Sequence, residues 1–251
     1  MSLHSNRCLI IPDVHQDIAW VDKIFARETN YDLVVFLGDY FDGYLPPQLG
    51  TSAADTCAYL DKKRRELGDR VVFLLGNHDI QYLESKPACD AHRTPRDLHY
   101  HCGAAFSLPI ARQVAKNLSP EFWQNARLFA DVNGWLLSHA GVARTFWPVR
   151  TDLAESLATL EDICRTALRT IPEKSSPLLR AGQMRSGDQA VGGITWLDWI
   201  FEFEDNLPCP QIVGHTASPE GARQNGRSWC LDGRQTNYGV LTAEGLRIEA
   251  C

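Results

Sequence analysis

Apolar runs that end abruptly in polar residues alternate with helix-like segments in the first third of the chain. The runs are RCLIIPDVH (7–15), DLVVFLGD (32–39) and VVFLLGNHD (71–79). Between them, apolar residues recur at helical spacing after Asp17, and a second helix is expected from Ala53 to Gly68. Continuous apolar strands with helical crossovers are typical of a parallel sheet covered on both faces. The pattern therefore predicts an α/β fold.

The pattern is less regular in the rest of the chain. Residues 84–125 are rich in proline and predict an inserted cap with short helices at 104–117 and 120–125. Strands are expected at 127–132, 135–137 and 211–213, and residues 151–193 predict a helical and loop insertion whose helix covers 152–171. SWCLD and YGVLTA predict a terminal hairpin. We expect one domain, residues 1–251.

Composition excludes some partners. Hydrophobic residues make up 44% of the 251 residues and charged residues 22%, as in an ordinary globular protein. The formal charge of −6 argues against nonspecific binding to nucleic acid or to an anionic membrane. No apolar run approaches the roughly 20 residues that span a bilayer. We expect no nucleic-acid partner and no membrane segment, whereas the oligomeric state is not readable.

The eight cysteines are scattered and form no CxxC pair. A chain of this length does not need disulfides, so reduced thiols in a cytoplasmic protein are the favoured interpretation. The N-terminal MSLHSNR has no apolar signal core, which agrees with a cytoplasmic location. A structural zinc at His99, His101 and Cys102 is the alternative, although these residues lack a second spaced ligand pair.

Five predicted strands end in residues that can bind metal ions. The groups are Asp13 with His15, Asp39 with Asp42, Asn77 with His78 and Asp79, then His139 alone and His215 alone. Each by itself is an ordinary turn or helix cap. Together they line the carboxyl ends of strands, where α/β sheets bind ligands, and oxygen and nitrogen donors suit divalent metals. Because a carboxylate can bridge two ions, the set predicts a two-metal site.

In order, these motifs read DxH, GDxxD, GNHD, H and GH, and the series resembles the calcineurin-like metallophosphoesterases. The resemblance extends from Asp13 to His215, most of the chain. It implies a four-layer αββα sandwich of two mixed sheets flanked by helices, with two metal ions at the strand ends. Manganese is the expected metal, with iron or zinc as alternatives.

The resemblance also implies a role for each matched side chain. Six are implied as metal ligands: Asp13 and His15 for the first ion, Asp39 as the bridge, and Asn77, His139 and His215 for the second. His78 matches the histidine that protonates the leaving oxygen, and Asp42 the acid that orients it. A protonated imidazole beside a carboxylate suits that task. For Asp79 two roles stay open, helix capping and catalysis.

Two departures affect the expected substrate. Ala217 stands where many relatives have a second histidine in GHTH, which places the chain nearer the serine/threonine phosphoprotein phosphatase and diadenosine tetraphosphatase branch. That branch normally has an arginine where this chain has Gly43. Arg144 is the first candidate to replace this phosphate-binding arginine, and Arg180 or Arg185 are alternatives.

The predicted function is hydrolysis of a phosphate ester by attack of a metal-activated hydroxide. The phosphorylated substrate is unassigned among phosphoproteins, dinucleoside polyphosphates and small phosphate esters. A non-catalytic metal-binding scaffold that uses the same fold as an interaction module is the alternative. Trp196 and Trp199 either line the site or pack in the core.

Overall fold

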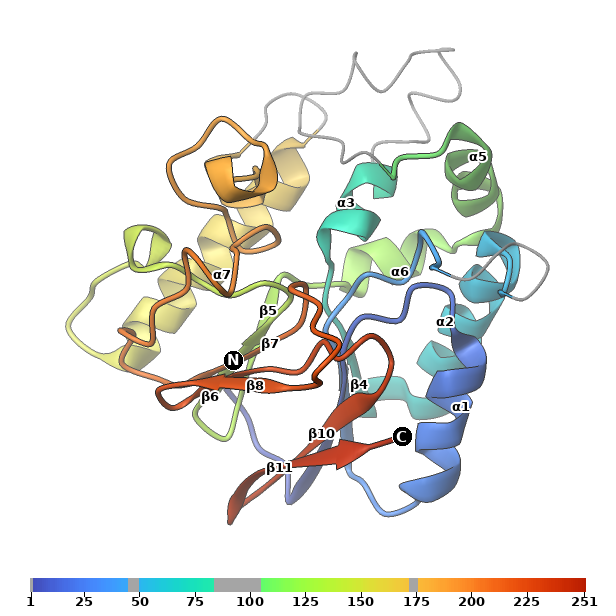
Figure 1. The fold of residues 1–251 in the computed structure, drawn as a ribbon, viewed down its shortest axis with the longest axis horizontal. Coiled ribbons are helices and arrows are strands. Elements are labelled where there is room, and N and C mark those ends of the chain that lie inside the picture. The colour runs from blue at the N-terminus through green and yellow to red at the C-terminus, as the bar shows by residue number, and fades with distance from the viewer. Residues whose placement is uncertain (1, 45–49, 84–104, 172–175) are drawn as a thin grey trace.

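Two β-sheets pack against each other with helices on their outer sides in the computed structural model (Figure 1). The structure describes residues 2–44, 50–83, 105–171 and 176–251. Both sheets contain parallel and antiparallel strand pairs. The expected αββα arrangement of two mixed sheets is confirmed.

The five-stranded sheet carries the three apolar runs from the start of the chain. Its order is β11 (Gly245–Ala250), β10 (Asn237–Thr242), β2 (Arg7–Ile11), β3 (Leu33–Phe36) and β4 (Val71–Phe73). The neighbours β2, β3 and β4 are parallel, as the sequence predicts, while β10 and β11 run antiparallel at one edge. Because these three strands are parallel, their carboxyl ends lie at the same edge.

The six-stranded sheet forms the second inner layer. Its order is β1 (Ser2–Leu3), β5 (Phe129–Val132), β6 (Trp135–Ser138), β7 (Gln211–Val213), β9 (Ser228–Cys230) and β8 (Arg223–Asn225). Strands β6 and β7 are parallel neighbours at its centre. Their carboxyl ends lead into the SHAG and GHT motifs.

Alternating side chains separate the core into two parts. In β2, Cys8 and Ile10 face the second sheet and pack in one cluster with Leu137 and Ile212, while Leu9 and Ile11 belong to the cluster that includes the helices. This alternation follows from the two-residue period of a strand. A strand that is apolar on both faces is therefore buried between a sheet and a helical layer.

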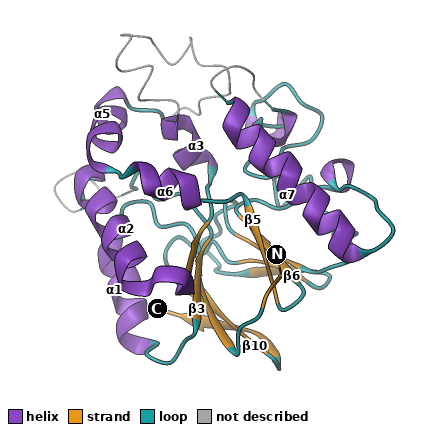
Figure 2. Cartoon of the chain, turned by 180° about the vertical axis from the view of Figure 1, so that it is seen from behind, coloured by secondary structure: helices purple, strands orange, loops and turns teal. Residues whose placement is uncertain are grey.

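The helices form the outer layers (Figure 2). On the five-stranded sheet lie α1 (Ile18–Arg27), α2 (Ala53–Leu67) and α6 (Pro120–Asn125), and α7 (Leu153–Thr170) covers the other sheet. Helix α5 (Leu108–Asn117) packs against α2 and α3 (Asn77–Leu83). The helix ends follow local signals: Asp17, Ser52 and Asp152 accept backbone N–H bonds as N-caps. Gly68 ends α2 at φ 56°.

The expected cap is described only from residue 105 onward. There, α5 packs beside α2, and the side-chain oxygen of Gln113 accepts the backbone N–H of Ala54. The alternative zinc residues His99, His101 and Cys102 lie outside the described residues. The six cysteines in the described part of the chain are free.

The predicted terminal hairpin is wrong. Strand β9, which carries SWC, pairs with β7 and β8 in the six-stranded sheet, whereas β10 pairs with β2 and β11 in the other sheet. The connection includes Arg234 and Gln235 at positive φ and crosses between the sheets. The hairpins in this terminal part of the chain are β8–β9 and β10–β11, and the Asn-Gly pair at 225–226 is the turn signal for the first.

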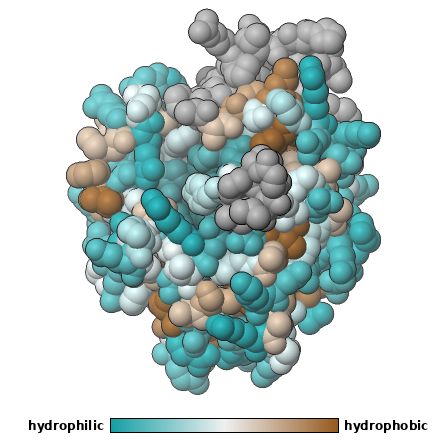
Figure 3. Space-filling model, turned by 45° about the vertical axis from the view of Figure 1, so that its right-hand side comes forward, coloured by the Kyte–Doolittle hydropathy of each residue, from teal (hydrophilic) through white to brown (hydrophobic). Residues whose placement is uncertain are grey.

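One face of the molecule is mainly polar where the structure describes it (Figure 3). On the face shown in Figure 3, apolar side chains are scattered among hydrophilic ones. In the described parts of the chain, no helix has both the length and the apolar character that crossing a bilayer requires.

Replacing Gly38 by alanine is expected to destabilise the fold. Gly38 has φ 110°, and a Cβ there would lie 2.4 Å from the backbone nitrogen of Gly76. Backbone strain and the clash together predict a loss of about 2–5 kcal/mol in the free energy of unfolding, measured by urea denaturation. Gly134→Ala is the control, because Gly134 has φ 80° but no atom near its Cβ position. Gly134→Ala should lower the free energy of unfolding by only about 1 kcal/mol. Equal losses in the two variants would contradict the close approach of Gly38 to the backbone of Gly76.

Candidate metal centre

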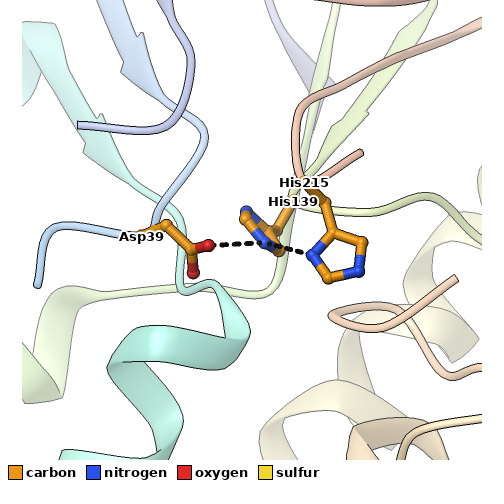
Figure 4. Close-up of side chains that lie close together, drawn as sticks. All are labelled: Asp39, His139 and His215. Carbon is orange, nitrogen blue, oxygen red and sulfur yellow. Dashed lines mark hydrogen bonds and ion pairs between the residues drawn. The ribbon is translucent and has the colours of Figure 1, made fainter. Parts of the chain in front are cut away.

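The five predicted strand ends converge where the two sheets meet. Strands β2, β3 and β4 supply Asp13 with His15, Asp39 with Asp42, and Asn77, while β6 and β7 of the other sheet supply His139 and His215. Asp39, His139 and His215 point toward one another across this junction (Figure 4). The structure thus brings side chains from five separate strand ends to one place.

Several of these residues have a backbone that side chains seldom adopt. His15, Asp39, Asp42 and His215 have φ of 42°, 51°, 59° and 69°. Such conformations are rare outside glycine and cluster at functional sites, where the surroundings must hold them. Here the carbonyl oxygen of Asp39 accepts the backbone N–H of His15 at 2.7 Å, which ties two of the strained turns together.

Four side-chain atoms form one tight group. His139 Nε2 lies 3.0 Å from Asn77 Oδ1, 3.1 Å from His215 Nδ1 and 3.4 Å from Asp39 Oδ2. Ligands about 2.0–2.2 Å from a tetrahedral ion lie about 3.3–3.6 Å apart, close to these separations. The group fits one transition-metal ion with oxygen and nitrogen donors.

A second group shares one of these atoms. Asp13, His15 and Asp39 bring their ligand atoms within 4.8 Å of one another, and His15 Nε2 lies 3.6 Å from Asp39 Oδ2. The same Oδ2 faces His139, while the Asp39 Oδ1 atom accepts the backbone N–H of His78 at 2.9 Å. Asp39 is therefore placed to bridge two ions.

Backbone carbonyl groups orient the histidines. The Nδ1 atom of His139 lies 3.0 Å from the carbonyl oxygen of Leu37. The Nδ1 atom of His15 lies 3.0 Å from the carbonyl oxygens of both Phe41 and Asp42. Donation from Nδ1 leaves the Nε2 lone pair of each ring facing the cluster, an arrangement typical of metal-binding histidines.

The electrostatics of the cluster also favour cations. Burial, and then the nearby Asp232 carboxylate, raise the pKa of Asp13 well above its usual range. Burial also opposes ionisation of Asp39, but His139 and His78 outweigh it and hold the pKa of Asp39 well below its usual range. Burial lowers the pKa of His215, which keeps its imidazole neutral as metal binding requires. Positive ions at this position would stabilise the buried carboxylates.

Asp232 is a site residue that the sequence predictions missed. It follows β9, is 1% exposed, and its Oδ2 atom has no hydrogen-bond partner among the described residues. The hairpin predicted for SWCLD and YGVLTA separates Asp232 from the other strand ends. The same signal, an acid directly after an apolar strand, would have identified it.

His78 and Asp42 form a hydrogen-bonded pair beside the metal ligands. His78 Nδ1 lies 2.7 Å from Asp42 Oδ2, and the other Asp42 oxygen accepts the hydroxyl of Tyr82. Burial lowers the pKa of His78, but the carboxylates of Asp39 and Asp42 outweigh it and raise that pKa to about 9. The imidazole is therefore held in its protonated form at neutral pH, with its other nitrogen free to act.

Asp79 has a structural place in the site. Its Oδ2 atom accepts the backbone N–H groups of Gly76 and Asp39, and its Oδ1 atom accepts that of Tyr40. Asp79 is the third residue of α3 (Asn77–Leu83), and its carboxylate accepts the backbone N–H of Gly76, the residue before the helix, as the acidic residue of a capping box does. Of the two roles left open for Asp79, these contacts favour capping, and they also hold the turn that carries Asp39.

The candidate arginines differ in position. Arg144 is exposed in a short 3-10 turn (Arg144–Phe146) and lies outside the converging group, so its substrate role stays a prediction. Arg180 pairs with Asp188 at the surface. Arg185 donates from Nη2 to the Thr216 hydroxyl at 2.7 Å, directly beside His215.

The two tryptophans have different surroundings. The ring of Trp196 meets that of His215 edge-on, with centroids 5.8 Å apart. The ring centroids of Trp199 and Phe203 lie 4.1 Å apart, and both residues belong to a small apolar cluster with Val213. Trp196 lines the site, and Trp199 serves the core.

Comparison with known proteins agrees with this geometry. The family model for calcineurin-like phosphoesterases matches residues 7–219. The chain belongs to the calcineurin-like phosphoesterase family. No curated protein matches it in sequence.

Solved structures share the fold of this family member at low sequence identity. A cold-active protein-tyrosine phosphatase from a psychrophilic Shewanella species superposes with a TM-score of 0.60 at 16% identity, covering 98% of this chain and 78% of that one. A serine/threonine phosphatase from Saccharomyces cerevisiae, similar to human PP5, gives 0.53 at 12% identity, covering 97% and 78%.

Asp39→Asn is expected to weaken metal binding most. The amide carries no charge and offers a single acceptor oxygen, so it cannot bridge two ions and also accept the N–H of His78. The affinity for manganese should fall at least about tenfold, so less manganese should remain bound after dialysis. Elemental analysis measures the bound metal. Asp42→Asn is the matched control, because the Asp42 carboxylate binds His78, Gln81 and Tyr82, while its contact with His15 is made by the backbone carbonyl group, which the substitution keeps. This variant should retain its metal. Equal metal content in both variants would contradict the bridging role.

Asp79→Asn tests whether Asp79 is structural. An amide group would turn a donor toward one of the three backbone N–H groups, which predicts a loss of about 1.5–3 kcal/mol in the free energy of unfolding. Urea denaturation measures it, with the exposed Asp162→Asn as a control expected to change by no more than about 0.5 kcal/mol. Unchanged stability together with a large loss of kcat would instead assign Asp79 to catalysis.

Proposed function

We propose that the protein is a dimetal phosphoesterase that hydrolyses phosphate esters. The observation that carries the proposal is the shared Asp39 Oδ2 atom, which joins two groups of metal ligands beside the His78–Asp42 pair. When bound, two cations supply an activated water and neutralise the charge of the phosphoryl oxygens. Manganese is the metal we propose, with iron or zinc as alternatives, because the donor set combines carboxylate and amide oxygens with imidazole nitrogens.

A side chain of the protein supplies the proton that the leaving oxygen takes up. Attack of the water oxygen on phosphorus forms one P–O bond while the ester P–O bond breaks, and the leaving oxygen needs a proton. His78 is placed to donate it, because Asp42 fixes the ring through Nδ1 and leaves Nε2 as the donor. Asp42 is in turn held by Gln81 and Tyr82. Reprotonation of His78 from solvent closes the cycle.

The names of the structural neighbours support a phosphate ester and leave its identity open. One is a protein-tyrosine phosphatase and one a serine/threonine phosphatase. Phosphoproteins, dinucleoside polyphosphates and small esters are therefore all candidates. Arg144 is retained as a proposed substrate contact, and the free cysteines accord with a cytoplasmic location.

His78→Asn and Asp42→Asn are expected to lower kcat while the metal stays bound. Loss of the proton donor in His78→Asn should cost about 10²–10⁴-fold in kcat on an alkyl phosphate with a poor leaving group. Asp42→Asn should cost less, about 10–100-fold, because the imidazole remains but is no longer oriented. Steady-state kinetics with manganese-loaded protein measures the loss of kcat, and elemental analysis shows whether the metal stays bound.

A substrate panel provides the decisive control. Wild-type protein loaded with manganese should hydrolyse at least one of p-nitrophenyl phosphate, a phosphopeptide and a dinucleoside tetraphosphate. If it retained two metal ions but hydrolysed no phosphate ester, the non-catalytic scaffold would be the correct interpretation. If it bound no metal, both functions would fail.

A further inference from the structure

A cavity of about 620 Å³ opens beside the proton-donating pair. His15, Asp42 and His78 are among its lining residues. The remaining described lining comes from the loops after β2 and β3, the start of α2, and helix α5 with the residues just before it. On the proposed function, His78 protonates the leaving oxygen. Whatever is bonded to that oxygen therefore extends into this cavity, away from the second metal group.

Gly43 keeps the lining beside Asp42 free of any side chain. A Cβ at this position would lie 2.9 Å from the carbonyl oxygen of His15 and 3.2 Å from Gln16 Cβ. The Gly43 backbone N–H is also bound to the Gln16 side-chain oxygen at 3.0 Å. A long charged side chain cannot be placed here without moving His15, so the cavity is neutral at this point for a steric reason.

Three polar side chains of the lining are already engaged by the protein. Gln16 donates to the carbonyl oxygen of Thr51, Gln113 accepts the N–H of Ala54, and Ser52 caps α2. What remains for a ligand is mostly apolar surface, including Ile110 and Ala53. No lysine or arginine is among the described lining residues. Because the Asp42 carboxylate is paired with His78, the described part of the lining is best matched by an apolar occupant.

Tyr44 adds a flat aromatic surface at the opening. Its side chain is 59% exposed although it lines the cavity, and its ring lies 4.1 Å from that of His15 at 40°. An exposed aromatic ring beside an apolar cavity is suited to stack on a planar ligand. His78 lines the same cavity, so an aromatic ring bound there lies in the same space as the proton donor.

We propose that this cavity is the leaving-group subsite and that it selects an uncharged planar group, so that phosphate monoesters of phenols are the preferred substrates. The reaction is Ar–O–PO₃²⁻ + H₂O → Ar–OH + HPO₄²⁻, in which the P–O bond to the ring oxygen breaks and the phenol oxygen takes the proton of His78. A nucleoside polyphosphate leaving group would place charged phosphates against a mostly apolar lining. A small alkyl group leaves most of the cavity unfilled.

Tyr44→Ala tests the subsite by the difference between two esters. Its KM for phenyl phosphate should rise about 3- to 10-fold while the KM for ethyl phosphate stays unchanged. Comparing the variant with wild type on each ester removes the intrinsic difference in leaving-group reactivity. Phe201→Ala is the matched control, because Phe201 is an exposed aromatic side chain (73%) that does not line the cavity. Equal changes for both esters in Tyr44→Ala would overturn the proposal.

A binding measurement separates this inference from the proposed function. By calorimetry, manganese-loaded wild type should bind phenylphosphonate about 10- to 100-fold more tightly than methylphosphonate, and Tyr44→Ala should reduce that preference. Equal affinities for the two phosphonates would overturn the subsite even if esters were hydrolysed. A retained phenyl preference in a protein that hydrolyses no ester would support the subsite and reject the phosphoesterase function.

Discussion

The structure depends on the burial of one carboxylate, that of Asp39, at the junction of the two sheets. A buried carboxylate is costly unless hydrogen bonds and positive charges compensate it. Here the backbone N–H of Asp39 is held by Asp79, its Oδ1 atom accepts the N–H of His78, and its Oδ2 atom faces histidines from both sheets. The charge is thus kept ionised where two cations can share it.

This arrangement requires the backbones of neighbouring strands to approach closely at their ends. Gly38 and Gly76 lie against each other, and a Cβ on Gly76 would overlap Asp39 Oδ1. Across the junction, a Cβ on Gly214 would overlap Asp13 Oδ1. The Asp13 carboxylate also accepts the backbone N–H of His215. The glycines beside the ligands therefore set the distances between the ligands.

The site separates the chemistry of the reaction from that of recognition. The groups that we propose to bind metal and to move the proton come from strand ends, which the sheets hold in place. The cavity beside His78 is formed by Gly43, Tyr44 and the helices α2 and α5, which belong to the outer layer. Such a division allows the same reacting groups to serve different leaving groups, because loops and helix ends can change without moving the strands.

The sequence alone determined the strands that end in Asp13, Asp39 and Asn77, the helices between them, and the chemistry of the ligand set, because strand and helix periodicity and turn residues are local signals. It did not determine that β9 and β10 lie in different sheets, since an apolar strand does not specify its partner. For this reason Asp232 was missed. Only the tertiary structure placed Asp79 as a brace and left a neutral cavity beside Gly43, because both depend on contacts between segments far apart in the chain.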